Sequence, residues 1–506
     1  MTDTVHTSNP AGLNPAGLNP AGLNPAVASS TASATELLAD FAAGRRLPSE
    51  VVAESLARIA ATEPEINAVT GILATDPDQV AAVAAADAYW RGHAGPGAAA
   101  PADRPLLGVP VVVKEKHAVA GHPVDQAVPA TVQTPDVDHP VVARLRAAGA
   151  VLVARTANPE FCAATFTDSA AHGVTRNPWN PEFTPGGSSG GSGAALAAGY
   201  APLATGSDIG GSTRIPATFC GVVGYKAPYG VVPGLHPSTM DWYRSDSAMA
   251  RTVGDVLLMH NVIAGRHPAD PNSVPLGPVT EPEDGWSVAG HRIIVSETLG
   301  DYPVDDTVVD NLRAAADALA ARGAVIEHRN PDWTVAELME VAMAHYGHTL
   351  APGMEEVIES SGAEVSPYIT QFIDHTLAAA ARMPLYETMV RETRIHTELG
   401  RLLDGATALI TPVTTADALP AEAPLVSVNS RGEHYWATHM AVPFNICNRN
   451  PALAVPTGVG PRGVPTGLQI VGDTYDQQAV FRVGFALEDA GTGVLQARGD
   501  VPDTTA

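Results

Sequence analysis

The stretch TPGGSSGGSGAALAAG at residues 184–199 is followed, after a short gap, by GSDIGGSTRIP at residues 206–216. Glycine permits backbone conformations that other residues avoid, so loops of this kind can present main-chain N–H groups to a developing anion. Serine hydroxyls in such loops can act as nucleophiles once a neighbouring base removes their proton. The apolar segment AALAAG that ends the first stretch predicts a helix, and it favours ordered, buried loops over a flexible linker.

Other interpretations of the two loops meet fewer requirements. The segment GGSSGG lacks the Gly-Lys-Ser/Thr ending of a nucleotide P-loop, and there is no clean strand, GxGxxG and helix unit of the kind that binds dinucleotides. Nucleophilic catalysis from Gly/Ser loops therefore remains the favoured hypothesis.

Predicted strands and helices alternate on both sides of these loops. Apolar strands over Val109–Val113 and Val151–Val153 flank a helix expected at 139–148, and Lys114 ends the first strand. The same alternation returns later in the chain, at Arg292–Val295, 306–322 and Leu409–Ile410. We therefore expect an α/β fold in which a single large mixed β-sheet is covered by helices on both faces.

Repeated NPAGL units near the start of the chain predict a tail without packed structure. Residues 1–32 contain these units and are rich in Gly, Pro and Asn, so we expect them to be disordered. A capping-box pattern formed by Ser33 and Glu36 predicts that order begins there. We expect one domain over residues 33–495 and a flexible tail over residues 496–506.

Residues 334–404 are expected to be helical and could form a substrate-specificity region. Their methionine and aromatic side chains could line a pocket, although side chains of these types lie more often in a helix core. These side chains, together with one histidine, are Met339, Met343, His345, Tyr346, Tyr368, Phe372, Met383 and Tyr386.

The composition argues against several classes of partner. The chain has 29 Lys and Arg against 54 Asp and Glu, so its net charge of −25 would repel nucleic acid and anionic lipid. No apolar run reaches the roughly 20 residues of a membrane helix, and the first residues lack the features of a secretory signal. We therefore expect a cytoplasmic enzyme with neither nucleic acid nor membrane as a partner.

The cysteines and histidines do not predict a metal site or a cofactor. The three cysteines, Cys162, Cys220 and Cys447, form no CxxC motif, and the histidines show no clustering in the sequence. Their low number fits a reducing compartment. Cys162 and Cys220 lie in apolar sequence surroundings, so we expect them to be buried core thiols.

Several motifs together resemble the amidase signature enzymes. The two Gly/Ser loops match the signature of this family, and the resemblance runs from about residue 33 to about residue 490. The further matching motifs are GVPVVVKEKHAVAG at 108–121, RNPWNP at 176–181, MARTVGD at 249–255 and PTGLQIVGD at 465–473. The resemblance implies the fold expected above and a hydrolase that acts on linear amide bonds.

The resemblance also implies a catalytic set. Ser212 matches the nucleophile of the family, Ser188 the bridging serine beside a cis peptide bond, and Lys114 the catalytic lysine. The main-chain N–H groups of the oxyanion hole match Ile209, Gly210, Gly211 and Ser212. A lysine can act as the base if burial lowers its pKa toward neutrality, and the three valines before Lys114 suit such burial.

Other residues of the loops are expected to support this set. Ser189 and Ser192 would hydrogen-bond within the loops, and Asp208 and Arg214 would pair to hold the loop that carries the nucleophile. Three positions depart from the usual family pattern. They are Glu115 in place of Asp, Ser207 in place of Thr, and GYKAPYG at 224–230 in place of a segment containing LKPT. We expect these departures to touch the periphery rather than the triad.

The expected activity is hydrolysis of a small-molecule carboxylic amide to a carboxylate and ammonia or an amine, through an acyl-enzyme on Ser212. Two alternatives use the same triad. The acyl group could pass to an amine acceptor, as in an acyl transferase, or the chain could supply ammonia as one component of an amidotransferase. No cofactor or metal is expected, and a homodimer is compatible with the resemblance because members of the family are often dimers.

Overall fold

The computed structural model describes residues 32–491, apart from residues 236, 423–424, 429–430 and 439. The tail expected at 1–32 therefore lies outside the described residues except for residue 32. The tail expected at 496–506 and the end of the domain expected at 495 also lie outside them. The capping box expected at Ser33 is present, because its hydroxyl accepts from the N–H of Glu36 and the Glu36 carboxylate accepts from the N–H of Ser33.

Eleven strands within the described residues form one mixed sheet. Parallel pairs join β3 to β2, β2 to β6, β11 to β9 and β9 to β10, while the other neighbours are antiparallel. In spatial order the strands are β1 (Val69–Ile72), β3 (Val151–Thr156), β2 (Pro110–Lys114), β6 (Leu203–Asp208), β8 (Ser245–Ala250), β7 (Val223–Lys226), β14 (Ala452–Val459), β15 (Pro465–Val471), β11 (Ala408–Pro412), β9 (Arg292–Val295) and β10 (Val325–His328).

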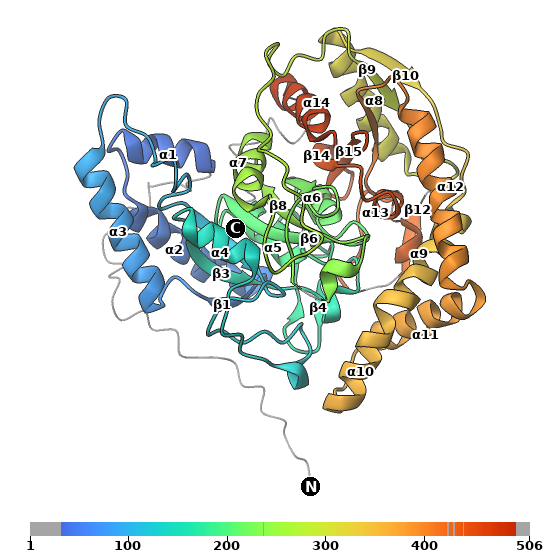
Figure 1. The fold of residues 1–506 in the computed structure, drawn as a ribbon, viewed down its shortest axis with the longest axis horizontal. Helices are drawn as coiled ribbons and strands as arrows, with labels where there is room; N and C mark the ends of the chain where they lie inside the picture. Colours follow the sequence, from blue (N-terminus) through green and yellow to red (C-terminus); the bar gives the residue numbers. More distant parts are fainter. Residues whose placement is uncertain (1–31, 236, 423–424, 429–430, 439, 492–506) are drawn as a thin grey trace.

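Helices cover both faces of this sheet (Figure 1). One core cluster joins a face of the sheet to α1 (Ala34–Ala42), α3 (Pro77–His93), α4 (Pro140–Ala147), α7 (Val253–Ile263), α8 (Asp306–Ala321) and α14 (Gln477–Ala490). A second cluster joins the opposite face to α2 (Pro48–Ile66), α5 (Gly190–Ala197) and α6 (Arg214–Phe219). The expectation of a single mixed sheet between two helical layers is confirmed.

Short elements complete the described chain. Two small hairpins pair β4 (Asp168–Ser169) with β5 (Gly173–Val174) and β12 (Leu425–Val428) with β13 (Arg431–His434). The remaining helices outside the helical region described next are η1 (Pro129–Thr131), η2 (Glu160–Cys162), η3 (Ser238–Met240), η4 (Tyr435–Thr438) and α13 (Pro443–Ile446).

The alternation of side chains along β2 places Lys114 on one particular face of the sheet. Val111 and Val113 pack in the first cluster, whereas Val112 packs in the cluster with α5 and α6. Because successive side chains of a strand point to opposite faces, Lys114 shares the face of Val112. The parallel pairing of β2 with β6 places the end of β2 beside the loop that follows Asp208. The two Gly/Ser loops therefore meet at Lys114.

Four helices form a separate layer beside the second face, drawn in yellow and orange in Figure 1. They are α9 (Val335–Thr349), α10 (Ala351–Ser361), α11 (Pro367–Arg382) and α12 (Leu385–Leu403). Most of the methionine and aromatic side chains singled out from the sequence are buried or partly buried there, as expected for a helix core. Tyr386 is the exception, with 80% of its surface exposed.

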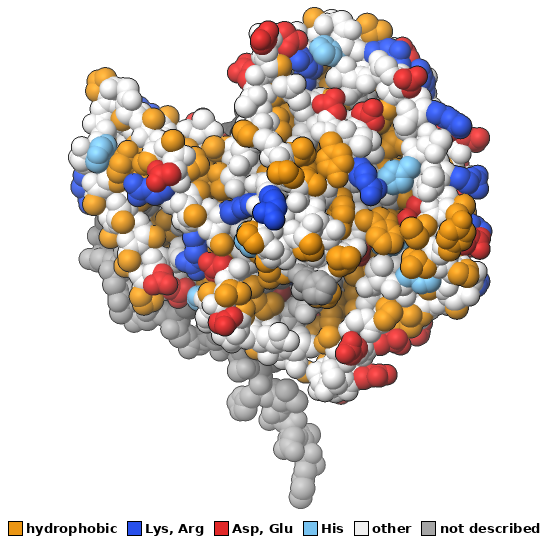
Figure 2. All heavy atoms as spheres, viewed as in Figure 1, with side chains coloured by type: hydrophobic (Ala, Val, Ile, Leu, Met, Phe, Trp, Pro, Cys, Tyr) orange, Lys and Arg blue, Asp and Glu red, His pale blue; other side chains and the backbone are white. Residues whose placement is uncertain are grey.

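The outer face of α12 leaves apolar side chains in contact with solvent. Leu385, Tyr386, Met389 and Val390 are all exposed. Figure 2 shows apolar atoms gathered on the edge of the molecule where Figure 1 draws these helices. Within the described chain, no helix is both long enough and apolar enough to span a lipid bilayer.

Candidate active site

Lys114 is fully buried and faces a ring of serine hydroxyls. Its Nζ donates to Oγ of Ser188 at 2.8 Å, to Oγ of Ser189 at 3.0 Å and to Oγ of Ser207 at 3.0 Å. Its main-chain N–H donates to Oγ1 of Thr205 at 2.8 Å, which fixes the end of β2 against β6. No carboxylate forms an ion pair with Nζ among the residues that the structure describes. Lys114 is therefore held by neutral oxygen atoms.

Burial lowers the pKa of the Lys114 ammonium to about 8. The positive charges of Lys116 and Arg244 act in the same direction, whereas the negative charge of Asp246 acts against them. A substantial share of the lysine is therefore neutral near pH 8. A neutral amine 2.8 Å from the Ser188 hydroxyl can accept its proton, which an ordinary surface lysine cannot do at this pH.

Ser188 and Ser212 belong to the two Gly/Ser loops and line one pocket. The peptide bond between Gly187 and Ser188 is cis, as the resemblance implies. The N–H of Ser189 donates to the main-chain oxygen of Ser212 at 3.0 Å and so ties the loops together. In the described structure, the hydroxyls of Ser188 and Ser212 are not hydrogen-bonded to each other. The structure thus brings Lys114 and Ser188 into contact and places Ser212 beside them.

The loop from Ile209 to Ser212 differs in one respect from the expected oxyanion hole. The N–H of Gly211 donates to Oδ1 of Asp208 at 2.9 Å, so it is directed at that carboxylate rather than at a substrate. The N–H groups of Ile209, Gly210 and Ser212 have no protein partner within the described chain. The candidate oxyanion donors are therefore these three, and the assignment of the Gly211 N–H is corrected.

Two glycines of this loop are required by close packing. A side chain at Gly210 would place its Cβ 2.9 Å from the Tyr346 hydroxyl. Gly211 has a φ of +106° and would place a Cβ 2.6 Å from Cβ of Ala441. Both positions exclude larger residues, since contacts this short force the neighbouring atoms to move. The loop therefore depends on the glycines that made it conspicuous in the sequence.

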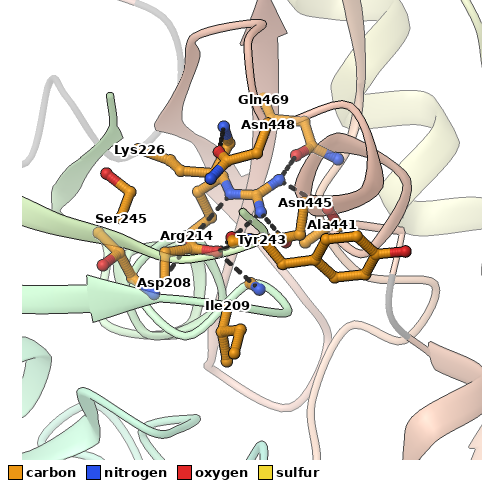
Figure 3. Close-up of polar contacts among 12 residues, drawn as sticks. Asp208, Ile209, Arg214, Lys226, Tyr243, Ser245, Ala441, Asn445, Asn448 and Gln469 are labelled. Atoms are coloured by element: carbon orange, nitrogen blue, oxygen red, sulfur yellow. Dashed lines mark hydrogen bonds and ion pairs between the residues drawn. The ribbon is translucent and has the colours of Figure 1, made fainter. Parts of the chain in front are cut away.

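A buried ion pair between Asp208 and Arg214 holds the loop in place (Figure 3). Arg214 donates through Nε to Oδ2 of Asp208 at 3.0 Å and through Nη2 to Oδ1 at 2.9 Å, which confirms the expected pairing. The other donors of Arg214 reach Oδ1 of Asn445 at 2.7 Å and Oε1 of Gln469 at 2.6 Å. Burial alone would raise the pKa of Asp208, but Arg214 holds it well below its usual range. The Asp208 carboxylate therefore remains charged at neutral pH.

The pocket around the two serines has a wall of apolar and aromatic side chains. Its apolar and aromatic members are Phe161, Cys162, Ala163, Ala164, Ile209, Tyr346, Leu350, Phe372 and Trp436. Cys162 was expected to be a core thiol, but it is only partly buried and lies in this wall. Its backbone adopts a left-handed conformation with a φ of 58°, which turns the segment toward the pocket. Cys220 is buried as expected.

Two contacts of the site were missed from the sequence. Ser207 was counted among peripheral departures, yet its hydroxyl contacts Nζ of Lys114, so that expectation was wrong for this residue. Tyr346 donates through its hydroxyl to the main-chain oxygen of Ile209 at 2.8 Å. The sequence signal for the Ser207 contact was its spacing of two residues from Thr205, because residues two apart in a strand lie on the same face. No sequence pattern predicts the hydrogen bond from Tyr346 to Ile209.

A cluster of titratable groups lies beside the lysine strand. His117, His139 and Asp246 are far apart in the sequence, but their ligand atoms lie within 4.8 Å of one another. Asp246 accepts from Nζ of Lys116 at 2.9 Å and contacts Nε2 of His117 at 3.0 Å. Burial would raise the pKa of Asp246, but these neighbours keep it well below its usual value. The carboxylate is therefore already matched by Lys116, and the other nitrogen of His117 contacts Oγ1 of Thr205 at 2.8 Å.

A second buried network joins the helical region to the core. His345 of α9 contacts Oδ1 of Asp241 at 2.9 Å and Oε1 of Glu392 at 3.2 Å, and its ring stacks on Tyr243. Burial by itself would lower the pKa of His345, but the hydrogen bonds and charges of the two carboxylates raise it above its ordinary value. His345 therefore bridges α9, α12 and the segment before β8.

Replacing His345 by glutamine is expected to destabilise the fold by about 2 kcal/mol near pH 6, the scale of hydrogen bonds to charged groups. Because the folded pKa is raised, this stabilisation is fully present below about pH 6.5 and is lost as the pH rises through the folded value. Urea midpoints of parent and variant should therefore differ more at pH 6 than at pH 9. An equal difference at both pH values would contradict a charged His345.

The comparisons with known proteins agree with this geometry. A sequence model of a family described as Amidase matches residues 50–481. The chain belongs to this family. As an amidase family member with solved neighbours that act on carbon–nitrogen bonds, it is an enzyme that acts on amides.

Two similar curated proteins are named as components of the glutamyl-tRNA(Gln) amidotransferase. The protein of Acidothermus cellulolyticus is 33% identical over an alignment that covers 94% of this chain and 97% of that protein. The protein of Roseiflexus sp. is 32% identical over an alignment that covers 86% of this chain and 91% of that protein. The amidase family member described here is therefore similar to these amidotransferase components along most of its length.

Solved structures of the family share the fold. A bacterial aryl acylamidase of the amidase signature family superposes with a TM-score of 0.82 at 23% identity, covering 93% of this chain and 98% of that chain. A 6-aminohexanoate cyclic dimer hydrolase complexed with substrate gives a TM-score of 0.76 at 25% identity, covering 94% of this chain and 99% of that chain. The amidase fold is therefore complete over the described residues.

Proposed function

We propose that this enzyme hydrolyses a carboxylic amide to a carboxylate and ammonia or an amine, with Ser212 as nucleophile, Ser188 as bridging serine and Lys114 as base. The observation that carries the proposal is the buried amine of Lys114, whose Nζ lies 2.8 Å from Oγ of Ser188 in the pocket that Ser212 lines. An amine that can be neutral near pH 8 and that contacts the Ser188 hydroxyl is suited to activating a nucleophile through it.

The reaction follows from the arrangement of these groups. Oγ of Ser212 attacks the amide carbon while its proton passes to Oγ of Ser188, whose own proton passes to Nζ of Lys114. The resulting oxyanion would be stabilised by the N–H groups of Ile209, Gly210 and Ser212, with a contribution of roughly 3 kcal/mol per donor. The carbon–nitrogen bond then breaks as the relay returns the proton to the leaving amine. Water attacks the acyl-enzyme by the same relay in reverse.

The relay requires the hydroxyls of Ser188 and Ser212 to come into hydrogen-bond contact when substrate is bound. Catalytic hydrogen bonds are often longer in unliganded enzymes and shorten in the substrate complex. The main-chain bond between Ser189 and Ser212 keeps the two loops together in the meantime. We expect a substrate that fills the pocket to bring the Ser212 hydroxyl closer to the Ser188 hydroxyl.

The acylation rate is expected to rise with pH through about 8, as Lys114 loses its proton and becomes the base. Pre-steady-state acylation with an ester or anilide substrate, followed between about pH 6 and pH 9, measures this step free of product release. A rate that is constant over this range would show that Lys114 does not titrate as the base.

The proposed function is tested by incubating the purified chain with aliphatic, aryl and peptide amides and measuring ammonia, amine and carboxylate together. Intact-mass measurement after rapid acid quenching should show an acyl adduct on the peptide that contains Ser212. Added hydroxylamine distinguishes a hydrolase from a transferase, because a transferase yields mainly the hydroxamate even when water is in large excess. Absence of both released amine and acyl adduct across the panel would contradict the proposal.

A second candidate function is supported by the curated relatives, whose names place them in the glutamyl-tRNA(Gln) amidotransferase. In that case the same triad would release ammonia from an amide donor for a partner protein. Ammonia release from glutamine that appears only when partner proteins are added would favour this role. Turnover of simple amides by the isolated chain favours the hydrolase.

A further inference from the structure

Arg244 lies in the wall of the catalytic pocket, together with Ser188 and Ser212. Within the described residues its guanidinium has no hydrogen bond and no ion pair, and its Nε is buried without a partner. Leaving a buried donor unpaired costs free energy, and more so when the group is charged. The guanidinium therefore lies in the pocket wall without a hydrogen-bonded or ion-paired partner among the described residues.

The acidic groups around Arg244 form their hydrogen bonds and ion pairs with other residues, although Oδ2 of Asp241 is buried without a partner and the charge of Arg244 helps to lower the pKa of Asp241. Asp208 pairs with Arg214, and Asp246 accepts from Lys116. Asp241, three residues before Arg244, accepts through Oδ1 from Nε2 of His345. None of these carboxylates lies within ion-pair distance of the Arg244 guanidinium in the described structure. The pocket thus carries the positive charge of Arg244 in addition to the Lys114 amine.

Arg244 also lines a second cavity, which adjoins the catalytic pocket at this residue. The charged and hydroxyl side chains of that cavity are Lys116, Tyr229, Ser238, Thr239, Ser245, Asp246 and Asp270. The catalytic pocket is instead walled by apolar and aromatic side chains on the side of Leu350, Phe372 and Trp436. A bound molecule with one polar, charged end would therefore be oriented with that end at Arg244.

We propose that Arg244 binds a carboxylate of the substrate, so that the enzyme acts on amides that carry a free carboxylate, such as the monoamide of a dicarboxylic acid. The inference rests on the proposed amide hydrolysis at Ser212. A guanidinium offers two parallel N–H donors that match the two oxygens of a carboxylate, and pairing satisfies the donor that the protein leaves unpaired. The amide end of the molecule then lies in the pocket with Ser188 and Ser212.

The test compares each monoamide of the C3 to C6 dicarboxylic acids with the neutral amide in which a methyl group replaces the carboxylate. The measured quantity is the ratio of kcat/KM within each pair, because effects on the base or on folding are common to both members and cancel. For the best chain length, the parent enzyme should favour the acidic amide by at least about tenfold, and Arg244→Gln should remove most of that preference. Arg244→Lys should retain part of it.

Lys116→Gln serves as the matched control. It removes one positive charge close to Lys114, but Lys116 lines only the neighbouring cavity and pairs with Asp246. The ratio should therefore stay near the parent value in this variant. An equal ratio in the parent and in Arg244→Gln, or a parent preference for the neutral amides, would overturn the assignment of Arg244.

A binding measurement separates this inference from the proposed function. If the parent hydrolyses no member of the series, hydrolysis at Ser212 fails, and calorimetry of glutaramate with the parent and with Arg244→Gln then decides the role of Arg244. Binding weakened at least about tenfold by the substitution supports a carboxylate site. Equal affinity, with circular dichroism showing that both proteins are folded, refutes it.

Discussion

Replacing Ser212 by alanine is expected to abolish amide hydrolysis, with kcat falling on the order of 10⁴-fold or more, as in serine hydrolases that lose their nucleophile. Lys114 and Ser188 remain in contact in this variant, but no oxygen is left to form the acyl-enzyme. The measurement is amine release from the best substrate of the panel. The acyl adduct seen by mass spectrometry should disappear with the activity.

Ser192→Ala is the control for this substitution. Ser192 is also a buried serine of the same Gly/Ser loops, but it contacts Oγ of Thr156 at 2.8 Å and donates to the main-chain oxygen of Thr205 at 2.8 Å, with no contact to Lys114. It should therefore keep most of the activity. Equal amine release by the parent and by Ser212→Ala would remove Ser212 from the mechanism.

Replacing Arg214 by methionine is expected to lower the free energy of unfolding by about 3–5 kcal/mol, because it leaves the Asp208 carboxylate buried without its partner. Activity should fall as well, since Asp208 holds the N–H of Gly211 and with it the candidate oxyanion loop. Urea unfolding followed by fluorescence and circular dichroism measures the stability. Coincident transitions by the two probes are required before a free energy is extracted.

Two further variants make the argument about Arg214 specific. Arg176→Gln removes a partly exposed arginine that pairs with the exposed Glu422 at 2.6 Å, and it should cost no more than about 1 kcal/mol. The double variant Asp208→Asn with Arg214→Met removes both charges and should be more stable than Arg214→Met alone. A double variant that is no more stable than the single one would show that the unpaired charge is not the cause.

The sequence predicted the elements that obey a local pattern. The apolar run before Lys114 became β2, and the alternation of its side chains is what sends Lys114 to the face of the Gly/Ser loops. The contact of Lys114 with Ser188 and the pairing of Asp208 with Arg214 followed from motifs whose order in the chain is characteristic of the family. Periodicity and motif order are properties of the sequence itself, so they were available before the structure.

The errors concern choices that depend on tertiary packing. The hydrogen bond from the Gly211 N–H to Asp208 depends on the conformation of the loop from Ile209 to Ser212. The position of Cys162 in the pocket wall depends on its left-handed backbone. The proximity of His117, His139 and Asp246 arises because three distant segments meet at one edge of the sheet. None of these features has a local sequence signal, since each is decided by which segments the fold brings together.

The bonds from His345 and Tyr346 to the core constrain how this enzyme could acquire a new specificity. His345 contacts Asp241, and Tyr346 donates to the main-chain oxygen of Ile209. These adjacent residues of α9 therefore connect the helical layer to the segment before β8 and to the loop from Ile209 to Ser212. Exchanging all four helices of this layer would remove the Tyr346 hydrogen bond and so weaken the support of the loop from Ile209 to Ser212. Leu350 and Phe372 line the pocket through apolar contacts. At these two positions selection or engineering can change the shape of the pocket without breaking the hydrogen bonds of His345 and Tyr346.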